Sequence, residues 1–416
     1  MPLLNKVGTV SADGPGLPSL TRLRLALTVF FALDGFIFAG WVVRIPAIKE
    51  QTGASSSDLG LALLGVSAGA VITMMLTGRL CRRFGSHEVT VACAVLLPLT
   101  IVLPPLTHAP LTLGLVLLVF GAAYGGINVA MNSAAVDLVA ALGRPVMPSF
   151  HAAFSLGGMV GSGLGGLVAA HLSPTRHLMA IMVIGLAVTA AAAPTLLRRR
   201  SPAAPERIRP TERPAERPRS AATTAEPAPP HRLDRGARVL VAVFGLIALC
   251  TAYGEGALAD WSALHMEEDL HAHPGLAAVS YSCFAFAMTI GRLSGTALLE
   301  RLGRTRTLVL GGATGAAGML LGALAPSVWL ALVGFAVTGL GLANLFPVAI
   351  ERAGALAGPT GVAAASTLGY GGMLLGPPAI GFMADWFSLP LALTSVALLA
   401  AVAATIGFTT RHAATG

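Results

Sequence analysis

Apolar segments long enough to cross a lipid bilayer recur along almost the whole 416-residue chain. A transmembrane helix needs about 20 mostly apolar residues. We predict twelve such segments, at 24–43, 58–80, 89–108, 111–136, 151–171, 178–197, 238–261, 274–298, 307–325, 328–350, 361–384 and 390–409. Only 11% of the residues are charged, against about 25% in soluble domains. The sequence therefore predicts an all-α membrane protein with twelve transmembrane helices, and excludes an ordinary soluble enzyme, a disordered chain and a small secreted scaffold.

The positions of the basic residues predict the orientation of these helices. If the N-terminus is cytoplasmic, alternation of the loops places 24 of the 27 lysines and arginines on the cytoplasmic side. Only Arg44, Lys49 and Arg176 then lie outside. Cytoplasmic loops of membrane proteins are rich in Lys and Arg. We therefore expect a multi-pass protein of the inner cell membrane with both termini in the cytoplasm.

One polar stretch, residues 198–238, interrupts the apolar pattern. It holds 11 arginines, 5 acidic residues and 8 prolines, a composition too polar and too rich in proline to pack. We interpret it as a cytoplasmic linker. An arginine-rich stretch can also bind nucleic acid, but no aromatic residues interleave here, and cytoplasmic loops are basic by default. Contact with anionic lipid is the stronger alternative.

Short motifs occur twice in the same order, once on each side of this linker. The second copy follows the first by 214 to 221 residues in each of four pairs. The pairs are Asp34-Gly35 with Glu255-Gly256, RRFG ending at Gly85 with ERLG ending at Gly303, GGIN ending at Asn128 with GLAN ending at Asn344, and GGM around Gly158 with GGM around Gly372. We predict two pseudo-symmetric six-helix bundles, 22–197 and 238–410. A linker at 198–237 would join them, and tails at 1–21 and 411–416 would flank them.

The duplicated topology and the segment GRLCRRFG at 78–85 resemble the major facilitator superfamily. Three further segments resemble a bacterial subgroup near the fucose:proton symporter branch: GINVAMNSAAVDL at 126–138, FHAAFSLGG at 150–158 and GEGALADWSAL at 254–264. The resemblance implies a 6+6 bundle with a substrate site between the halves, near the middle of the membrane.

The loops between helices two and three, and between helices eight and nine, hold the candidate interhelical residues. In the superfamily the first of these loops usually carries an acidic residue, which is thought to latch helices on the cytoplasmic side. This sequence has Arg82 at that position, so the latch is in doubt in the first half, whereas the second copy keeps Glu300. The resemblance makes these two loops gating or interhelical candidates, through Arg82, Arg83, Gly85, Glu300, Arg301 and Gly303.

Two carboxylates in matching repeat positions are the candidates for proton coupling, Asp34 in helix one and Glu255 in helix seven. An ionised carboxylate at the centre of a membrane helix costs about 2.5–3.5 kcal/mol, so each needs water, a partner or a proton. The resemblance implies that helices one, four, seven and ten line the central cavity. Fucose-type relatives carry an acid at the position of Asn128, so a proton site here must use other carboxylates. The alternative is an inert hydrogen-bonding or ion-pairing role.

The candidates for solute binding are three asparagines and a tryptophan. Asn128 and Asn132 lie four residues apart and therefore project from one helix face, and Asn344 is the repeat mate of Asn128. Amides can recognise polar solutes without charge, but they also join helices in membranes. Trp41 follows Asp34 by seven residues and can stack on a ring-shaped solute or anchor at the membrane interface.

The remaining candidates are predicted near the mouths of the pathway. Asp260 and Trp261 are expected at the outer mouth, as a gate or an interfacial anchor. His151 opens helix five from the cytoplasmic side and can titrate near neutral pH. Asp137 is a candidate partner of Arg144 or His151.

No enzyme or metal motif accompanies these features. We find no phosphate-binding loop of the Gly-x-x-x-x-Gly-Lys-Ser/Thr type, no His-Glu-x-x-His, no Cys-x-x-Cys and no nucleophile elbow. We therefore expect neither catalysis nor a cofactor, and a monomer driven by an ion gradient or by the solute's own gradient. The leading prediction is a secondary transporter that imports a small polar solute with protons by alternating access. The alternatives are a proton-driven exporter of an amphipathic metabolite or drug, and a membrane sensor that does not transport.

Overall fold

The computed structural model describes residues 17–142, 146–198 and 235–410, and in these ranges every regular element is a helix. The all-α prediction is confirmed for this part of the chain. The expectations for residues 1–16, for Arg144, for linker residues 199–234 and for the tail 411–416 lie outside the described residues.

The helices that precede the linker pack mainly with one another, α3 with α5 and α1 with α6 most extensively. They are α1 (Leu17–Val42), α2 (Ile45–Thr52), α3 (Ser56–Phe84), α4 (Ser86–Thr100), the short 3-10 helix η1 (Pro104–Leu106), α5 (Pro110–Leu142), α6 (Met147–Ala169) and α7 (Pro174–Leu197). We call this group the first bundle.

The helices that follow the linker form a second group, in which α13 packs along α8 and α11 lies between α12 and α14. They are α8 (Arg235–Glu268), α9 (Pro274–Ala277), α10 (Val279–Leu293), α11 (Gly295–Ala323), α12 (Val328–Leu342), α13 (Leu345–Trp386) and α14 (Leu389–Thr409). We call this group the second bundle.

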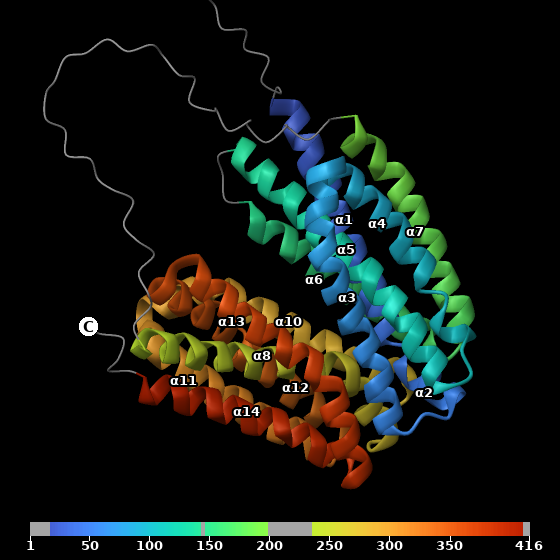
Figure 1. Ribbon diagram of the computed structural model, residues 1–416. Coiled ribbons are helices and arrows are strands. Elements are labelled where there is room, and N and C mark those ends of the chain that lie inside the picture. The colour runs from blue at the N-terminus through green and yellow to red at the C-terminus, as the bar shows by residue number, and fades with distance from the viewer. Residues whose placement is uncertain (1–16, 143–145, 199–234, 411–416) are drawn as a thin grey trace, which may run out of the picture.

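The two bundles form a V (Figure 1). They meet at the end of the molecule that carries α2, which we call the α2 end. They diverge toward the opposite end, where α7 ends and α8 begins, which we call the linker end. Contacts between the bundles run from α3 to α13 and from α6 to α9 and α10.

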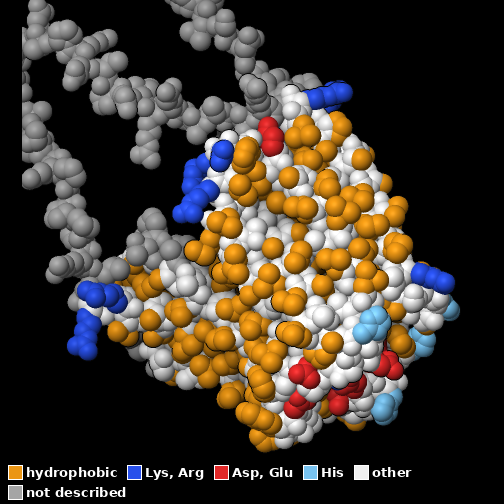
Figure 2. Space-filling model, turned by 45° about the vertical axis from the view of Figure 1, so that its right-hand side comes forward, with side chains coloured by type: hydrophobic (Ala, Val, Ile, Leu, Met, Phe, Trp, Pro, Cys, Tyr) orange, Lys and Arg blue, Asp and Glu red, His pale blue; other side chains and the backbone are white. Residues whose placement is uncertain are grey.

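The outer surface of both bundles is apolar over its middle and charged at its ends. Figure 2 shows most of the visible Lys and Arg toward the linker end, most of the Asp, Glu and His at the α2 end, and hydrophobic side chains between them. Large apolar side chains stand exposed on this surface, among them Met75, Leu111 and Leu167. Soluble proteins rarely expose so many large apolar side chains together, so this apolar belt is the face that contacts lipid.

Ten helices of the described residues are long and apolar enough to cross a membrane, against the twelve segments predicted. The two other segments, 307–325 and 361–384, lie in α11 and α13, where the chain changes direction. In α11 Gly303 has φ 76°, so the helix is kinked there. In α13 Gly369 packs on the ring of Phe346, although 23 residues of straight helix would separate them by about 35 Å. The chain therefore doubles back within α13.

The predicted repeat of the loops is visible in the backbone. Gly85 follows α3 with φ 100°, and its repeat mate Gly303 also has positive φ. These are two of the three glycines with positive φ in the described ranges. Side-chain-bearing residues avoid this conformation, which explains why both motif copies end in glycine.

Candidate functional site

A cavity with two adjoining lobes lies between the bundles, and Phe38, Phe154, Glu255 and Tyr281 line both lobes. The first lobe, of about 200 Å³, is bounded by α1, α3, α5 and α6 of the first bundle and by α8, α10 and α13 of the second. The second lobe, of about 180 Å³, is bounded by α1, α6, α8 and α10. Because both bundles supply walls, a change in the angle between them changes access to the cavity.

The first lobe, which we call the aromatic lobe, is walled largely by rings. Its aromatic residues are Phe38, Trp41, Tyr124, Phe154, Tyr281 and Tyr370. Phe38 stacks on Tyr124 with ring centroids 5.1 Å apart. Glu255 and Asp260, both half-buried, contribute carboxylates to the same lobe.

The second lobe, which we call the polar lobe, contains an ion pair. Arg292 at the end of α10 donates from Nη2 to Oε1 of Glu255 over 2.8 Å. His151 of α6 and Thr289 line the same lobe. Ser162 and Ser282 form a short hydroxyl contact across the bundles. Glu255 thus stands at the junction of the lobes, with its charge balanced by Arg292.

Asp34, the repeat mate of Glu255, has a different environment. Its side chain is completely buried in α1, and neither carboxylate oxygen has a hydrogen-bond partner. It is not among the residues that line either lobe. An ionised carboxylate without partners in such a site would cost far more than a protonated one.

None of the three asparagines is among the lining residues of the two lobes. Asn132 donates to the backbone oxygen of Asn128 over 2.7 Å, so this amide bonds within its own helix. Asn344 sits where α12 gives way to α13, and its amide donates to the Gly291 carbonyl of α10 over 2.9 Å. The amide of Asn344 therefore joins helices of the second bundle.

The two candidate tryptophans are both inside the protein. Trp41 is 1% exposed and lines the aromatic lobe, while Trp261 is fully buried with its Nε1 unpartnered. Neither side chain is therefore in contact with lipid. Trp329 and Trp386, more than two thirds exposed near helix ends at the α2 end, have the placement of interfacial anchors.

Asp137 and the candidate residues of the two loops lie at the linker end. Asp137 accepts a hydrogen bond from Ser86 Oγ over 3.2 Å at the start of α4, and His151 instead lies in the polar lobe, edge-on to Phe31. Four candidate loop side chains are exposed: Arg82, Arg83, Glu300 and Arg301. In the second loop an ion pair joins Arg304 to Glu351.

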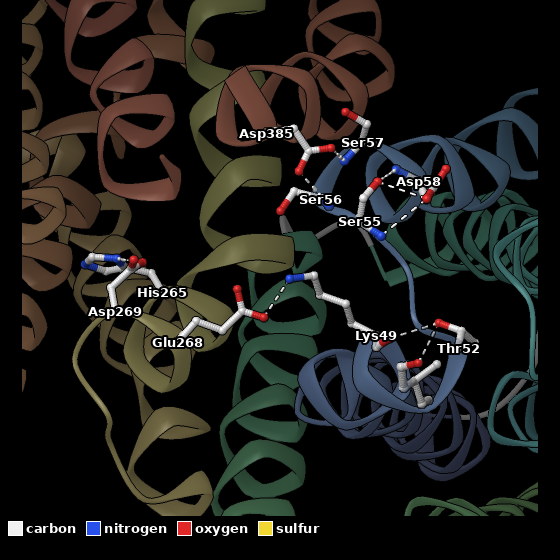
Figure 3. A network of polar contacts seen from close by, with 11 residues as sticks. Lys49, Thr52, Ser55, Ser56, Ser57, Asp58, His265, Glu268, Asp269 and Asp385 are labelled. Carbon is white, nitrogen blue, oxygen red and sulfur yellow. Dashed lines mark hydrogen bonds and ion pairs between the residues drawn. The ribbon is translucent and has the colours of Figure 1, made fainter. Parts of the chain in front are cut away.

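Polar contacts between the bundles gather at the α2 end (Figure 3). The carboxylate of Asp385, from the end of α13, accepts hydrogen bonds from the backbone N–H groups of Ser56 at 3.0 Å and Ser57 at 2.8 Å. These groups belong to the first turn of α3, where unpaired N–H groups and the helix dipole favour an anion. Nearby, Lys49 Nζ of α2 contacts Glu268 Oε1 of α8 at 2.6 Å. We call these two contacts the α2-end latch.

The environment of Asp385 favours its ionised form. Burial raises the pKa of this carboxyl, but hydrogen bonds from Ser57, Ser56 and Ser55 outweigh that effect and hold the pKa below its usual range. The carboxylate is therefore a stable acceptor at neutral pH.

Arg44 is buried just beyond the end of α1. Its Nε donates to His177 Nδ1 over 2.8 Å, and its Nη1 donates to the Ala169 carbonyl over 3.1 Å. Burial lowers the pKa of Arg44, and the charge of Glu267 partly opposes this. The guanidinium thus ties the end of α6 to the start of α7.

Most of the aromatic wall and the partner of Glu255 were not predicted from the sequence. The available signal was the tyrosines, since three of the four in the chain, Tyr124, Tyr281 and Tyr370, line the aromatic lobe. A polar hydroxyl inside an apolar segment needs a hydrogen-bond partner or water. That the three tyrosines line one lobe, however, becomes clear only from the arrangement of α5, α10 and α13 in space.

Comparison with curated proteins gives relatives over nearly the whole chain. An uncharacterized MFS-type transporter of Yersinia pestis is 34% identical over 391 residues, covering 92% of this chain and 94% of that protein. The membrane protein MosC of Rhizobium meliloti is 28% identical over 389 residues, covering 92% of this chain and 89% of that protein.

Solved structures share the fold at lower identity. A bacterial homologue of the human lysosomal transporter Spinster, inward-facing and unoccupied, superposes with a TM-score of 0.73 at 14% identity, covering 96% of this chain and 98% of that one. The nucleoside transporter NupG superposes with a TM-score of 0.70 at 16% identity, covering 93% and 98%.

The sequence profile of the Major Facilitator Superfamily matches residues 25–254 and 244–415. Together with the V of two helical bundles around a central cavity, this match shows that the chain belongs to the Major Facilitator Superfamily.

Proposed function

We propose that this chain is a secondary active transporter that couples the movement of a small solute to protons by alternating access. Membership of the superfamily makes it a multi-pass membrane transporter; the coupling, the direction and the solute are our proposals. One observation carries the proposal of alternating access: the cavity lies between two bundles that touch at the α2 end and diverge at the linker end. Rocking of the bundles would close one end and open the other.

The orientation follows from the charges. Lys and Arg dominate the linker end of the visible face and acidic residues the α2 end, so we assign the linker end to the cytoplasm. Both termini would then be cytoplasmic, in the inner cell membrane, and the described conformation would face inward. Because one chain supplies both walls of the cavity, we propose a monomer as the transporting unit.

We also propose that the spans number twelve, six in each of the domains 22–197 and 238–410. The reversal within α13 and the kink in α11 support the two spans that are missing from the ten long apolar helices. The matching backbone at Gly85 and Gly303 supports the duplication.

We propose Asp34 and Glu255 as the proton-coupling carboxylates. Glu255 faces the cavity and is paired with Arg292, so protonation or an arriving solute would break the pair. Asp34 lies in a dry, unpartnered site that favours a bound proton in this conformation. Opening at the α2 end would have to hydrate Asp34 for the proton to exchange.

The other candidates take more limited roles. We propose that Trp41 contacts the solute, since it lines the aromatic lobe, and that Asn344 positions α13, since its amide is bonded to α10. Asn128 and Asn132 would join the pathway only after helix movement. The likeness of 126–138, 150–158 and 254–264 to the fucose:proton symporter branch is the basis for proposing import with protons.

Export of an amphipathic compound with proton exchange is the second candidate. The aromatic lobe favours it, because six rings and two methionines give that lobe a mainly apolar wall. Direction distinguishes the two: an importer raises, and an exporter lowers, the amount of labelled solute held by energised cells.

Proton coupling can be tested with purified protein in liposomes. Sugars, polyols and amino acids are added outside, and the internal pH is followed with a trapped dye. We expect one solute class to acidify the lumen with the native protein, and Asp34→Asn and Glu255→Gln each to reduce this at least about tenfold, because a proton site is lost.

Glu50→Gln is the matched control, since it removes an exposed carboxylate of α2. It should transport like the native protein. Full proton movement in the Asp34→Asn, Glu255→Gln double variant would contradict the assignment of these carboxylates. Absence of coupled movement for every solute, combined with dye or drug efflux driven by an imposed proton gradient, would favour the exporter.

A further inference from the structure

We infer that the aromatic lobe binds small organic monocations, with Asp260 as the counter-ion. This rests on the proposed function, since it names the class of solute for the same cavity. The carboxylates of Glu255 and Asp260 line the lobe, while no lysine, arginine or histidine is found among its described lining residues.

The two carboxylates are not equivalent. Glu255 already has a counter-ion, because Arg292 donates to it over 2.8 Å from the polar lobe. For Asp260 the structure gives no hydrogen bond or ion pair with any described residue, although its side chain is half-buried. The lobe therefore retains one uncompensated carboxylate in a site of low polarity, where a cation is the complementary ligand.

The rings of the aromatic lobe favour the same kind of ligand. The faces of aromatic rings attract cations, and cages of several rings recognise organic ammonium groups. Tyr281 and Tyr370 line the same lobe as Asp260, and Tyr370 is half exposed. The stacked pair Phe38 and Tyr124 lines the lobe from the first bundle.

The size of the aromatic lobe limits the part of a ligand that can sit in it. Its volume of about 200 Å³ is below the 300–1,000 Å³ typical of sites for drug-sized molecules. The site therefore suits one ammonium group on a small apolar or aromatic body. A multiply anionic solute would meet two carboxylates and is disfavoured.

The test compares two probes of the same shape, 2-phenylethylamine, protonated at neutral pH, and 2-phenylethanol, which is neutral. Binding to the full-length protein in detergent is measured by calorimetry, without any ion gradient. We expect the native protein to prefer the amine at least about tenfold, the discrimination typical of a charged hydrogen bond.

Asp260→Asn should abolish this preference while binding of the alcohol changes less than about twofold, which also shows that the variant is folded. Tyr370→Leu should weaken binding of the amine more than binding of the alcohol. Glu50→Gln, an exposed carboxylate outside the cavity, should keep the preference. The inference is overturned if the native protein binds neither probe, binds both equally, or keeps its preference in Asp260→Asn.

This outcome can be separated from that of the proposed function. Binding of the amine that depends on Asp260, without proton-coupled movement in liposomes, would support the inference and oppose proton-coupled transport. Suppose instead that a sugar or polyol moves with protons, and that 2-phenylethylamine neither competes with it for binding nor inhibits its movement. That result would support transport and oppose the inference.

Discussion

At the scale of single residues, Arg44 shows how a charge is accommodated inside an apolar bundle. Its guanidinium bonds to His177 and to the Ala169 carbonyl, so replacement by methionine leaves both without their donor. Such losses cost about 1–3 kcal/mol. We expect Arg44→Met to unfold at clearly lower temperature in detergent, as followed by size-exclusion chromatography after heating. Arg176→Met, an exposed arginine at the same end, is the control, and equal melting temperatures would contradict this role.

At the scale of helices, α1 and α6 touch through their backbones. A methyl group on Gly157 would overlap the Ala32 carbonyl oxygen, whereas Gly163 in the same helix has open space. Overpacking typically costs about 1–3 kcal/mol, and here neither backbone can yield without separating the helices. We expect Gly157→Ala to lower the yield of folded protein and its melting temperature. Gly163→Ala should be neutral or slightly stabilising, because alanine favours helix; similar losses in both variants would refute the contact.

The start of α3 offers a prediction about pH. Because the pKa of Asp385 is held below its usual range, its contribution to latch stability is complete above about pH 4, the usual value for Asp. That contribution is lost only as the pH falls through the lowered pKa. We expect the difference in latch closure between native protein and Asp385→Asn to stay constant from about pH 5 to 8. Closure can be followed by spin-label distances across the α2 end, and a difference that vanished near neutral pH would show that Asp385 titrates there.

At the scale of the whole molecule, the α2-end latch biases the equilibrium between the two orientations of the bundles. Charge-assisted hydrogen bonds contribute about 1.5–3 kcal/mol and an exposed ion pair about 0.2–1 kcal/mol. Combining Asp385→Ala with Lys49→Met should therefore shift the equilibrium toward the form open at the α2 end by at least about tenfold. Spin labels on His108→Cys and Ser327→Cys, after replacement of the native cysteines, would report a longer distance. A distribution equal to that of a Glu50→Gln control would contradict the latch.

Sequence alone determined the properties that depend on local composition. Lipid demands long apolar helices and places basic residues preferentially on one side, so the all-helical membrane fold could be predicted residue by residue. The repeated glycines at 85 and 303 also reflect a local property, because each has a positive φ that glycine adopts most easily. The segments at 307–325 and 361–384 were predicted as spans of their own. The geometry of the kink at Gly303 and of the reversal within α13 depends on packing against other helices.

Only the tertiary structure decided which side chains meet. Asp34 and Glu255 occupy matching repeat positions, yet one is enclosed in its bundle and the other faces the cavity beside Arg292. Spacing along a helix gives the face of a residue but not what packs on that face. The latch between Asp385 and Ser56, 329 residues apart, has no sequence signature, because a helix N-terminus accepts any carboxylate that the fold brings to it. The local sequence thus determines where membrane helices form, whereas the cavity and its side chains depend on how the two bundles pack against each other.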